Sequence, residues 1–556
     1  MTLMTQADLI IRNARIMTMD DACPSAESLA VSGNVVVAVG SRDDVANLAG
    51  PATRTLDAGG ASVLPGFIES HLHIFSGAAS LSRLDLTGIE GKDALRNAVI
   101  NWSTRQPDGI IFANQAHYTI LGSGPITRQM LDEACPDRPF AMMAPDSHTA
   151  WANTPALTAA GILHGRQINP GSEIVMAEDG TASGELRETD AFAPVIALTE
   201  NQGREALGYT TARDPVPAPT RSQRSADIAT LQQGIEYCAS LGITSMHNMD
   251  GNLYQCELLQ EIHQAGGLNC RIEVPFHYKN DKQLSDLEEA EHMRRTWSSG
   301  HLWCNRVKLF MDGVLDSGTA FVLDGYPDDP SSTGDPLFSA EEFNEIASQC
   351  DGRGFQIAVH AIGDAAVRRT LDGYQAARKA NGKRDSRHRI EHIEIIDEAE
   401  IKRFAELGVI ASMQPLHALG TGSYPMEPTR SKIGDAKLAR AFAWNTLRDA
   451  GASLCFASDW PVSPVDPLMS IKAALTREKL HPSHPDQRQS LHQAVHGYTA
   501  GGAYAEFSED RKGTLKTGSL ADIVMLDGNI ETTDPGAIDA MKVTTTICDG
   551  VITYQD

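Results

Sequence analysis

Positive charge is scarce in this sequence. Lys and Arg number 47 against 72 Asp and Glu, so the formal net charge is −25 at pH 7. A surface of this sign repels the phosphates of nucleic acids and anionic lipid head groups. We therefore expect neither nucleic acid nor membrane as a partner, and a small molecule as the ligand.

Long apolar runs are missing as well. The sequence contains no run of about 18 apolar residues, the length that a membrane-spanning helix needs. The opening residues, MTLMTQADLIIRNAR, lack the basic start and long apolar stretch of an export signal. These absences predict a cytoplasmic protein that is neither exported nor membrane-spanning.

Paired cysteines are also absent. The nine cysteines lie between Cys23 and Cys548, and no two of them form a C-x-x-C motif. An odd number without such spacing is typical of buried thiols in a reducing compartment, and does not indicate a disulfide framework or a thiolate metal site.

What the sequence does contain, at both ends, is short strand-like runs separated by turn residues. Neither end has enough strands to bury a sheet face alone. We predict that the two ends pair into one small β-sandwich domain, residues 1–64 plus 511–556. The runs are residues 8–16, 34–40, 521–527 and 542–554.

Between about residues 65 and 510, short apolar strands alternate with amphipathic helical segments. This alternation predicts the α/β fold class and a parallel (β/α)₈ (TIM) barrel. A stretch at about 78–235, with one further strand-like run at 138–145, is predicted to be a large insertion on the catalytic side. The eight candidate barrel strands are residues 63–73, 243–249, 269–277, 306–313, 355–363, 388–395, 408–415 and 454–461.

Two helices between these strands have marked starts. Ser339 precedes Glu342 by three residues, which is a capping box, and apolar residues follow on one face. Asp397 likewise precedes Glu400, and Gly408 is predicted to end that helix.

Six residues with metal-binding chemistry stand at or near the C-terminal ends of the predicted strands, the face on which barrel enzymes carry their active sites. Alternate residues of a strand point the same way, so the two histidines of the His-x-His can bind one cation. Imidazole and carboxylate ligands suit zinc, manganese or iron, and the pattern predicts an open metal site with a bound water. The six are His71, His73, Lys308, His360, His392 and Asp459.

Each of these residues also has an ordinary structural interpretation. Lys308 can be a surface lysine on an apolar strand, and Asp459 can cap a helix. His360 and His392 can be hydrogen-bonded core histidines. The order and strand placement of all six together favour the metal site over these separate explanations.

Motifs along nearly the whole chain resemble the amidohydrolase superfamily (metal-dependent amidohydrolase family 3), and within it the branch that includes N-substituted formamide deformylases. Glu69 stands where these proteins often carry Asp; it is not a ligand position, so only the surroundings of the ligands should change. The motifs are PGFIESHLH (65–73), DSHTAWAN (146–153), SGELRET (183–189), GITSMHNMDG (242–251), VKLFMDGVLDSGTA (307–320), HAIGDAAV (360–367), RIEHI (389–393), SMQP (412–415), ASDWPVSP (457–464) and GSLADIVMLD (518–527).

The resemblance implies a binuclear metal centre. Zn²⁺ is the expected metal ion, and Mn²⁺ and Fe²⁺ are the alternatives. His71, His73 and Asp459 would hold one ion, and His360 and His392 the second. Lys308 would bridge both as a carboxylated lysine. Burial disfavours the ammonium form, so the neutral amine can add carbon dioxide, and two cations stabilise the resulting carbamate.

The implied activity is a metal-dependent hydrolase that cleaves an amide-type C–N bond, in an N-substituted formamide or another N-acyl compound. A metal-activated hydroxide would attack the carbonyl carbon, and Asp459 would move the proton to the leaving nitrogen. Members of this superfamily often form dimers or tetramers, so we expect a homo-oligomer.

Four residues are candidates for substrate contact. His148 and Trp151 lie in the predicted insertion, and His417 and Trp460 follow the seventh and eighth strands. Packing of the tryptophans and solvation of the histidines are the alternatives.

Other functions stay open at this point. The same activated water serves carbamates, esters and lactones, and a metal site of this kind also supports hydratase or isomerase reactions. A non-catalytic barrel scaffold is a further alternative, although such a protein should have lost ligands and here all six positions are filled.

Overall fold

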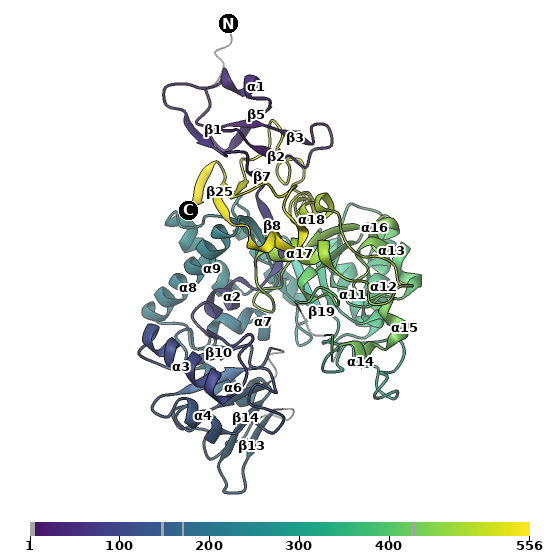
Figure 1. Cartoon of the computed structure of the whole chain (residues 1–556). Helices are drawn as coiled ribbons and strands as arrows, with labels where there is room; N and C mark the ends of the chain where they lie inside the picture. Colours follow the sequence, from purple (N-terminus) through teal and green to yellow (C-terminus); the bar gives the residue numbers. More distant parts are fainter. Residues whose placement is uncertain (1–5, 146–148, 169–171, 424–425, 428) are drawn as a thin grey trace. The chain divides into compact units, whose positions relative to one another are not determined.

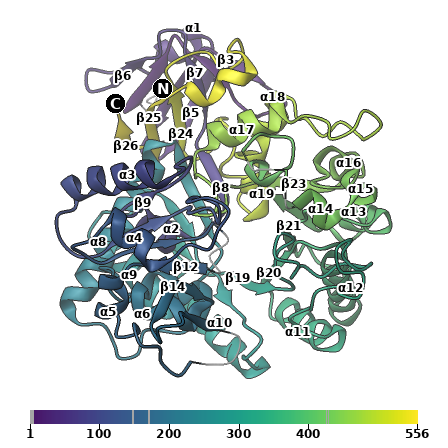
Figure 2. The same ribbon diagram turned by 60° about the horizontal axis from the view of Figure 1, so that its bottom comes forward.

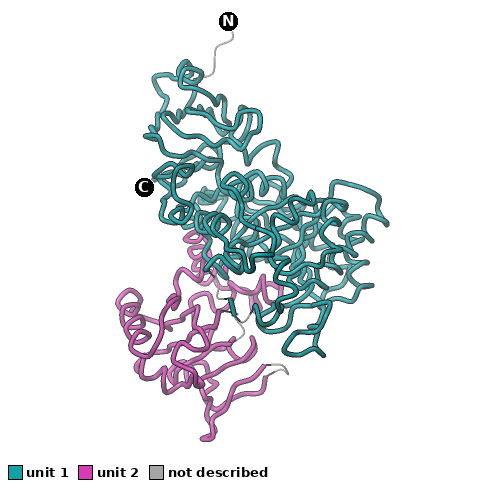
Figure 3. Tube along the Cα trace, turned by 45° about the vertical axis from the view of Figure 1, so that its right-hand side comes forward, with its two compact units in different colours: residues 1–73, 235–556 teal, residues 74–234 magenta. Residues whose placement is uncertain are grey.

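The protein divides into two compact units, one of residues 1–73 with 235–556 and one of residues 74–234 (Figure 3). The computed structural model describes residues 6–145, 149–168, 172–423, 426–427 and 429–556. In that part of the chain no helix has both the length and the apolarity to cross a membrane. The second unit, residues 74–234, overlaps the predicted insertion at about 78–235. The two chain ends belong to the first unit and do not form a unit of their own, so their composite domain stays a prediction.

Parallel strands form the centre of the first unit, in an α/β arrangement with two sheets. Their residues are buried on both faces, as is usual for parallel strands covered by helices. One sheet has the order β18-β16-β15-β8 and the other the order β17-β19-β20-β21-β22-β23. The strands are β8 (Phe67–Leu72), β15 (Ile243–Asn248), β16 (Arg271–Glu273), β17 (Phe276–His277), β18 (Leu302–Trp303), β19 (Arg306–Phe310), β20 (Gln356–Ala361), β21 (Arg389–His392), β22 (Ile410–Met413) and β23 (Ser453–Phe456).

Each predicted barrel strand overlaps an observed strand, with two corrections. The run 63–73 begins in β7 (Ser62–Pro65), which belongs to a different sheet, and only its second part is the parallel strand β8. The run 269–277 is two short strands, β16 and β17, separated by Val274 and Pro275. Pro275 has no N–H to donate to a neighbouring strand, which explains the break. The first half of the run pairs with β15 and the second half with β19. A parallel bridge between Leu72 and Trp460 joins the end of β8 to the segment after β23.

Helices and turns connect these strands (Figure 2). The predicted capping box is present, with Glu342 N donating to Ser339 Oγ at 3.2 Å. Asp397 caps a 3₁₀ turn that precedes the predicted helix, and Gly408 ends that helix at φ 70°. The helices of this unit are α1 (Arg42–Ala46), α9 (Leu253–Gln264), η2 (Leu284–Asp286), α10 (Leu287–Thr296), α11 (Ala340–Gly352), α12 (Asp364–Asn381), η3 (Glu398–Glu400), α13 (Ile401–Leu407), η4 (Pro415–His417), α14 (Thr429–Ile433), α15 (Asp435–Leu438), α16 (Trp444–Asp449), α17 (Pro467–Thr476), α18 (Leu491–Gly497), α19 (Ala500–Ala505) and η5 (Pro535–Ala540).

The two ends of the chain build two further sheets, which share one apolar core. A four-stranded sheet has the order β5-β4-β1-β6, and a six-stranded sheet, β26-β25-β24-β7-β2-β3, mixes strands of both ends (Figure 1). The strands are β1 (Leu9–Arg12), β2 (Arg15–Met17), β3 (Ser25–Ala26), β4 (Ser28–Ser32), β5 (Val35–Gly40), β6 (Arg54–Asp57), β7 (Ser62–Pro65), β24 (Ile523–Leu526), β25 (Val543–Cys548) and β26 (Val551–Gln555).

Two of the predicted runs at the chain ends divide at turns. The run 8–16 forms β1 and β2 in different sheets, because Asn13 takes the left-handed conformation at φ 53° and redirects the chain. The run 542–554 is a hairpin of β25 and β26, whose turn at Asp549 and Gly550 has φ of 54° and 76°. Asp-Gly is a preferred pair for such turns.

Gly66 lies where the chain passes from the small mixed sheet (β7) to the parallel strand β8. A Cβ atom at Gly66 would overlap Cγ2 and Oγ1 of Thr244 and lie 2.9 Å from its Cβ. We expect Gly66→Ala to lower the free energy of unfolding by about 1–3 kcal/mol through overpacking. The apparent melting temperature measures this, and Thr244→Ala in the same chain should restore part of the loss. An unchanged melting temperature in Gly66→Ala would contradict the tight contact.

The second unit has one six-stranded sheet of order β13-β14-β12-β11-β10-β9, with an apolar cluster containing Trp151 and a second one containing Phe192. The predicted run 138–145 corresponds to β11. The strands are β9 (Leu84–Asp85), β10 (Ile111–Asn114), β11 (Phe140–Met143), β12 (Thr149–Ala152), β13 (Glu173–Met176) and β14 (Ala182–Arg187). The helices are α2 (Ile74–Ser80), α3 (Lys92–Arg105), α4 (Arg128–Ala134), α5 (Thr154–Ala159), α6 (Thr189–Ile196), η1 (Arg204–Ala206) and α7 (Leu207–Thr210), and α8 (Arg221–Ser240) continues into the first unit.

Candidate metal centre

Asp459 lies between the two histidines of the His-x-His. Its Oδ1 is 3.3 Å from Nε2 of His71 and 3.3 Å from Nε2 of His73. One ligand atom from each of the three residues lies within 4.8 Å of the others, and all three side chains are buried. The structure therefore brings together three of the six predicted ligands.

The backbone around Asp459 holds this group in place. Asp459 has φ 63°, a left-handed conformation that is uncommon for residues other than glycine and recurs at functional sites. Its N–H donates to the carbonyl of His71 at 2.8 Å. Glu69 accepts from the N–H groups of His71, at 3.3 Å, and Ser458, at 2.8 Å, so it links β8 to the segment after β23. Burial raises the pKa of Glu69 to about 8.

A second cluster joins His392 and His417 to Asp459, again with ligand atoms within 4.8 Å of one another. The ring of His417 lies parallel to that of His392, with a centroid distance of 6.3 Å. His392 has φ 76°, which breaks the alternation of β21 just after the inward-pointing Glu391. Its Nδ1–H donates to the side-chain oxygen of Gln414 at 2.9 Å. This bond leaves Nε2 as the nitrogen with the lone pair.

His360 lies next to this cluster but outside both groups of ligand atoms. Its ring is 4.5 Å from that of His392 and stacks on Phe310 at 4.6 Å. Its Nε2–H donates to the carbonyl of Gly313 at 3.1 Å, so Nδ1 carries the lone pair. Burial lowers the pKa of His360 to about 3, which keeps the ring neutral.

Lys308 is completely buried on β19 rather than exposed at the surface. Its Nζ has no hydrogen-bond partner among the described residues and lies 4.7 Å from the centre of the Phe310 ring. Burial lowers the pKa of Lys308 to about 8, against the opposing charges of Glu391 and Asp459. Burying an amine without a hydrogen-bond partner costs folding free energy, unless the amine is chemically modified or binds a ligand.

Comparison with known proteins identifies the group to which this site belongs. The model of the amidohydrolase family matches residues 54–554. The chain belongs to the amidohydrolase family. It is therefore an enzyme, a metal-dependent hydrolase that acts on carbon–nitrogen bonds, as the sequence predicted.

Relatives of this amidohydrolase span its whole length at low identity. It is 26% identical to the putative amidohydrolase YtcJ of Bacillus subtilis, over 97% of this chain and 98% of that protein. It is 25% identical to the N-substituted formamide deformylase of Arthrobacter pascens, over 99% of each chain. The crystal structure of an uncharacterized metal-dependent hydrolase from Pyrococcus furiosus has a TM-score of 0.71 and 26% identity, and the match covers 95% of this chain and 99% of that one.

The donor atoms of the amidohydrolase site have the chemistry that a cation needs. His71 donates its Nδ1–H to Glu391 at 2.7 Å, so its Nε2, 3.3 Å from Oδ1 of Asp459, is the nitrogen that can bind a cation. Burial alone would raise the pKa of Asp459, but His71 and His73 hold that pKa well below its ordinary value. An imidazole nitrogen and a carboxylate oxygen 3.3 Å apart can share a proton or a metal ion, and a bound metal ion takes the place of the proton. The residues therefore fit a divalent metal ion.

His73 is flanked by a second carboxylate. Its Nδ1 lies 3.3 Å from Oδ1 of Asp250. Burial lowers the pKa of His73, but Asp250 and Asp459 outweigh that effect and raise it to about 9. Metal binding at Nε2 must therefore displace a proton from this ring.

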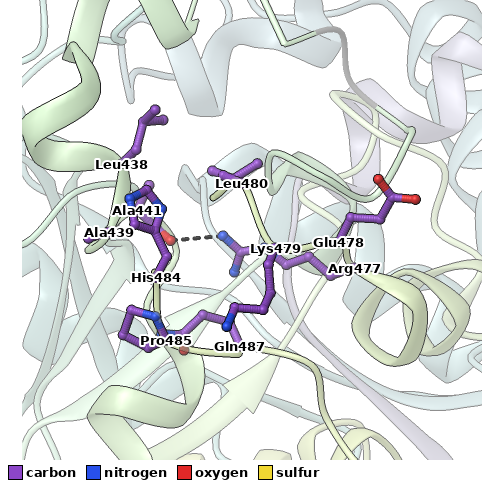
Figure 4. Close-up of a pocket in the computed structure, with 10 residues that line it drawn as sticks. All are labelled: Leu438, Ala439, Ala441, Arg477, Glu478, Lys479, Leu480, His484, Pro485 and Gln487. Carbon is purple, nitrogen blue, oxygen red and sulfur yellow. Dashed lines mark hydrogen bonds between the residues drawn. The ribbon is translucent and has the colours of Figure 1, made fainter. Parts of the chain in front are cut away.

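A buried arginine fixes the loop that carries His417. Arg477 donates to the carbonyl of Leu419 at 3.0 Å, to that of Ala441 at 2.8 Å and to that of Phe442 at 2.5 Å. Figure 4 shows the guanidinium facing Ala441. Arg477 therefore joins two backbone segments, one at Leu419 and one at Ala441 and Phe442.

The four predicted substrate contacts have different surroundings. His148 lies outside the described residues. Trp151 is only 2% exposed and packs on Tyr118 in the core of the second unit. Trp460 is 5% exposed and lies 5.9 Å from the ring of Tyr237. Of the three that the structure describes, His417 alone, half-buried beside His392, lies among the ligand atoms.

Sequence reasoning missed the residues that orient the ligands. These are Glu391 beside His71, Gln414 beside His392 and Asp250 beside His73. All three lie in the motifs RIEHI, SMQP and NMDG, and a histidine ligand usually donates its second N–H to such a group. Polar residues within these motifs could therefore have been predicted to orient the histidine ligands.

Proposed function

We propose that the protein hydrolyses the amide-type C–N bond of an N-substituted formamide or another N-acyl compound. The observation that carries the proposal is the buried Asp459 carboxylate held against the Nε2 atoms of His71 and His73. The N-substituted formamide deformylase of Arthrobacter pascens supports the substrate class through similarity over 99% of both chains. A small molecule is the expected partner, in a homo-oligomer.

A closed (β/α)₈ barrel is the fold that we infer for the first unit. One sheet runs from β8 through β15 to β16 and β18, and the other from β17 through β19, β20, β21 and β22 to β23. The bridge from Leu72 to Trp460 supports the return from the last strand to the first. In such a barrel the C-terminal ends of the strands face one site.

We propose two divalent metal ions as cofactors, with Zn²⁺ as the first choice of metal. His71, His73 and Asp459 would hold one ion, and His360 and His392 the other, with carboxylated Lys308 as the shared ligand. The unpartnered Nζ of Lys308 supports the carbamate, because carboxylation turns a costly buried amine into an anionic ligand. Bound there, the ions would polarise a carbonyl and lower the pKa of water.

Asp459 is the residue to which we assign proton transfer. Its Oδ1 faces the two imidazoles, and its Oδ2 lies 4.0 Å from Nδ1 of His392. We assign the proton to Oδ2, which would take it from the attacking water and return it to the leaving nitrogen. His417 would contact the acyl group from the loop that Arg477 holds.

The test is a hydrolysis screen together with metal analysis. Protein supplied with zinc and bicarbonate is assayed against N-formyl, N-acetyl, aryl-amide, carbamate and lactone substrates. We expect about two zinc ions per chain, release of an acid and an amine from one amide class, and loss of both metal and turnover in His71→Ala, His73→Ala. Turnover of only an ester or lactone would overturn the amide assignment, and a metal-free, inactive wild type would overturn the site.

A further inference from the structure

A line of buried polar side chains leads away from His71, through the interior of the parallel strands. Glu391 Oε2 accepts the Nδ1–H of His71 at 2.7 Å. Arg389 donates to both oxygens of Glu391, from Nε at 2.6 Å and from Nη2 at 3.0 Å. All three side chains are at most 1% exposed, so water does not weaken these contacts.

Arg389 has no freedom to turn away from Glu391. Its Nη2 also donates to the carbonyl of Ser70 and to Oγ of Ser412, both at 2.6 Å. Its Nη1 donates to Nδ1 of His247 at 2.9 Å. The guanidinium is thus fixed by three strands, β8, β15 and β22, besides its own.

The line of polar side chains continues beyond Arg389 and ends in a buried ion pair between Glu506 and Lys512. Because His247 accepts at Nδ1, its Nε2–H donates to Glu506 Oε2 at 3.0 Å. Glu506 lies 2.5 Å from Nζ of Lys512, which donates to Oγ of Ser245 at 2.7 Å. Arg389 and Lys512 can only donate, and the carboxylates of Glu391 and Glu506 accept. The direction of the hydrogen bonds of His247 between them follows from this: its Nδ1 accepts and its Nε2–H donates.

We propose that Glu391 is a positioning residue that locks His71 in the tautomer with the proton on Nδ1, and that Arg389 enforces this state. Arg389 offers Glu391 only donors, so both carboxylate oxygens must accept. The remaining contact of Oε2 can then only be an N–H from His71. Nε2 of His71, 3.3 Å from Oδ1 of Asp459, is thereby the nitrogen that is left for a metal ion. This inference rests on the proposed function, because it gives His71 a metal to bind.

Glu391→Gln is the informative variant, because it keeps the shape and changes one acceptor into a donor. Either orientation of the amide sets its N–H against an N–H of Arg389, and one orientation donates to His71 Nδ1 and moves the ring proton to Nε2. We expect the zinc dissociation constant, measured by competition with a chelator, to rise about 10–100-fold. Arg389→Lys keeps the charge but loses the two-pronged contact, so its constant should lie between those of the wild type and Glu391→Gln.

Asp522→Asn is the matched control. Asp522 also binds a buried arginine through both oxygens, with Arg271 Nε at 3.0 Å and Nη2 at 3.2 Å, but has no hydrogen bond to a histidine among the described residues. It should lower the melting temperature and leave the zinc dissociation constant unchanged. If Glu391→Gln folds and binds zinc as tightly as the wild type, the inference is wrong. If Glu391→Gln fails to fold, Arg389→Lys decides in the same way, and wild-type affinity there overturns the inference. A wild type that binds no zinc overturns the proposed function, and this inference with it. A wild type that binds zinc, together with a Glu391→Gln that binds it equally tightly, overturns this inference alone.

Discussion

Asp459→Asn should lower kcat by about a hundred- to ten-thousandfold, the usual worth of a positioned proton-transfer group. The amide keeps the size of the side chain and an oxygen for His71 and His73, but it cannot accept a proton. We therefore expect most of the zinc to remain bound while turnover is lost. Steady-state kinetics with metal analysis of the same sample measure both quantities.

The matched variant for Asp459→Asn is Asp250→Asn. Asp250 lies 3.3 Å from Nδ1 of His73 on the side away from Asp459, so it orients a ligand without touching the reacting atoms. Its replacement should weaken metal binding rather than the chemical step, and excess zinc should restore most of the turnover. Near-full turnover of Asp459→Asn would refute the role that we assign to this carboxylate.

Lys308→Ala is the second change with a large expected effect. The two proposed ions lose their shared ligand, and we expect about one ion per chain and a fall in kcat on the order of a thousandfold. The shortened side chain leaves room for a small carboxylate, so added acetate should recover part of the activity. Acetate should not recover His71→Ala, His73→Ala, which serves as the control. Full activity of Lys308→Ala without acetate would show that the lysine is no ligand.

The pH dependence of activation tests the same lysine independently. Only the neutral amine adds carbon dioxide, and the pKa of Lys308 in the metal-free protein is lowered by burial to about 8. At constant dissolved carbon dioxide, the rate of activation should rise about tenfold per pH unit below that pKa and level off above it. A rate that does not change with pH would argue against carboxylation of this amine.

The strands and most ligand positions could be predicted because they depend on simple rules. Alternation on a strand predicts that His71 and His73 point to one side, and Nε2 of each lies 3.3 Å from Oδ1 of Asp459. The same rule fails at His392, which follows the inward-pointing Glu391 directly. A backbone φ of 76° turns its ring toward the site, and no residue pattern predicts such a conformation at a histidine.

In the second unit, most of the strands could not be predicted from the sequence. The sequence indicated only β11 within it, although the sheet contains five further strands in the described residues. Several are very short, such as β9 (Leu84–Asp85), and too short to show a period of two. Trp151 illustrates the consequence, because a motif that resembled a substrate contact supplies a side chain to the core of that unit.

The strand that leads to the metal ligands has a consequence for how the protein is made. β7 continues through Gly66 into β8, and β7 pairs with β24, which begins only at Ile523. A ribosome releases residues in chain order, so the second unit, residues 74–234, is complete long before β24 exists. Asp459 also emerges almost four hundred residues after His71. The proposed ligands are therefore all present only after Asp459 has been made, so the complete set of ligands cannot bind a metal ion earlier in translation.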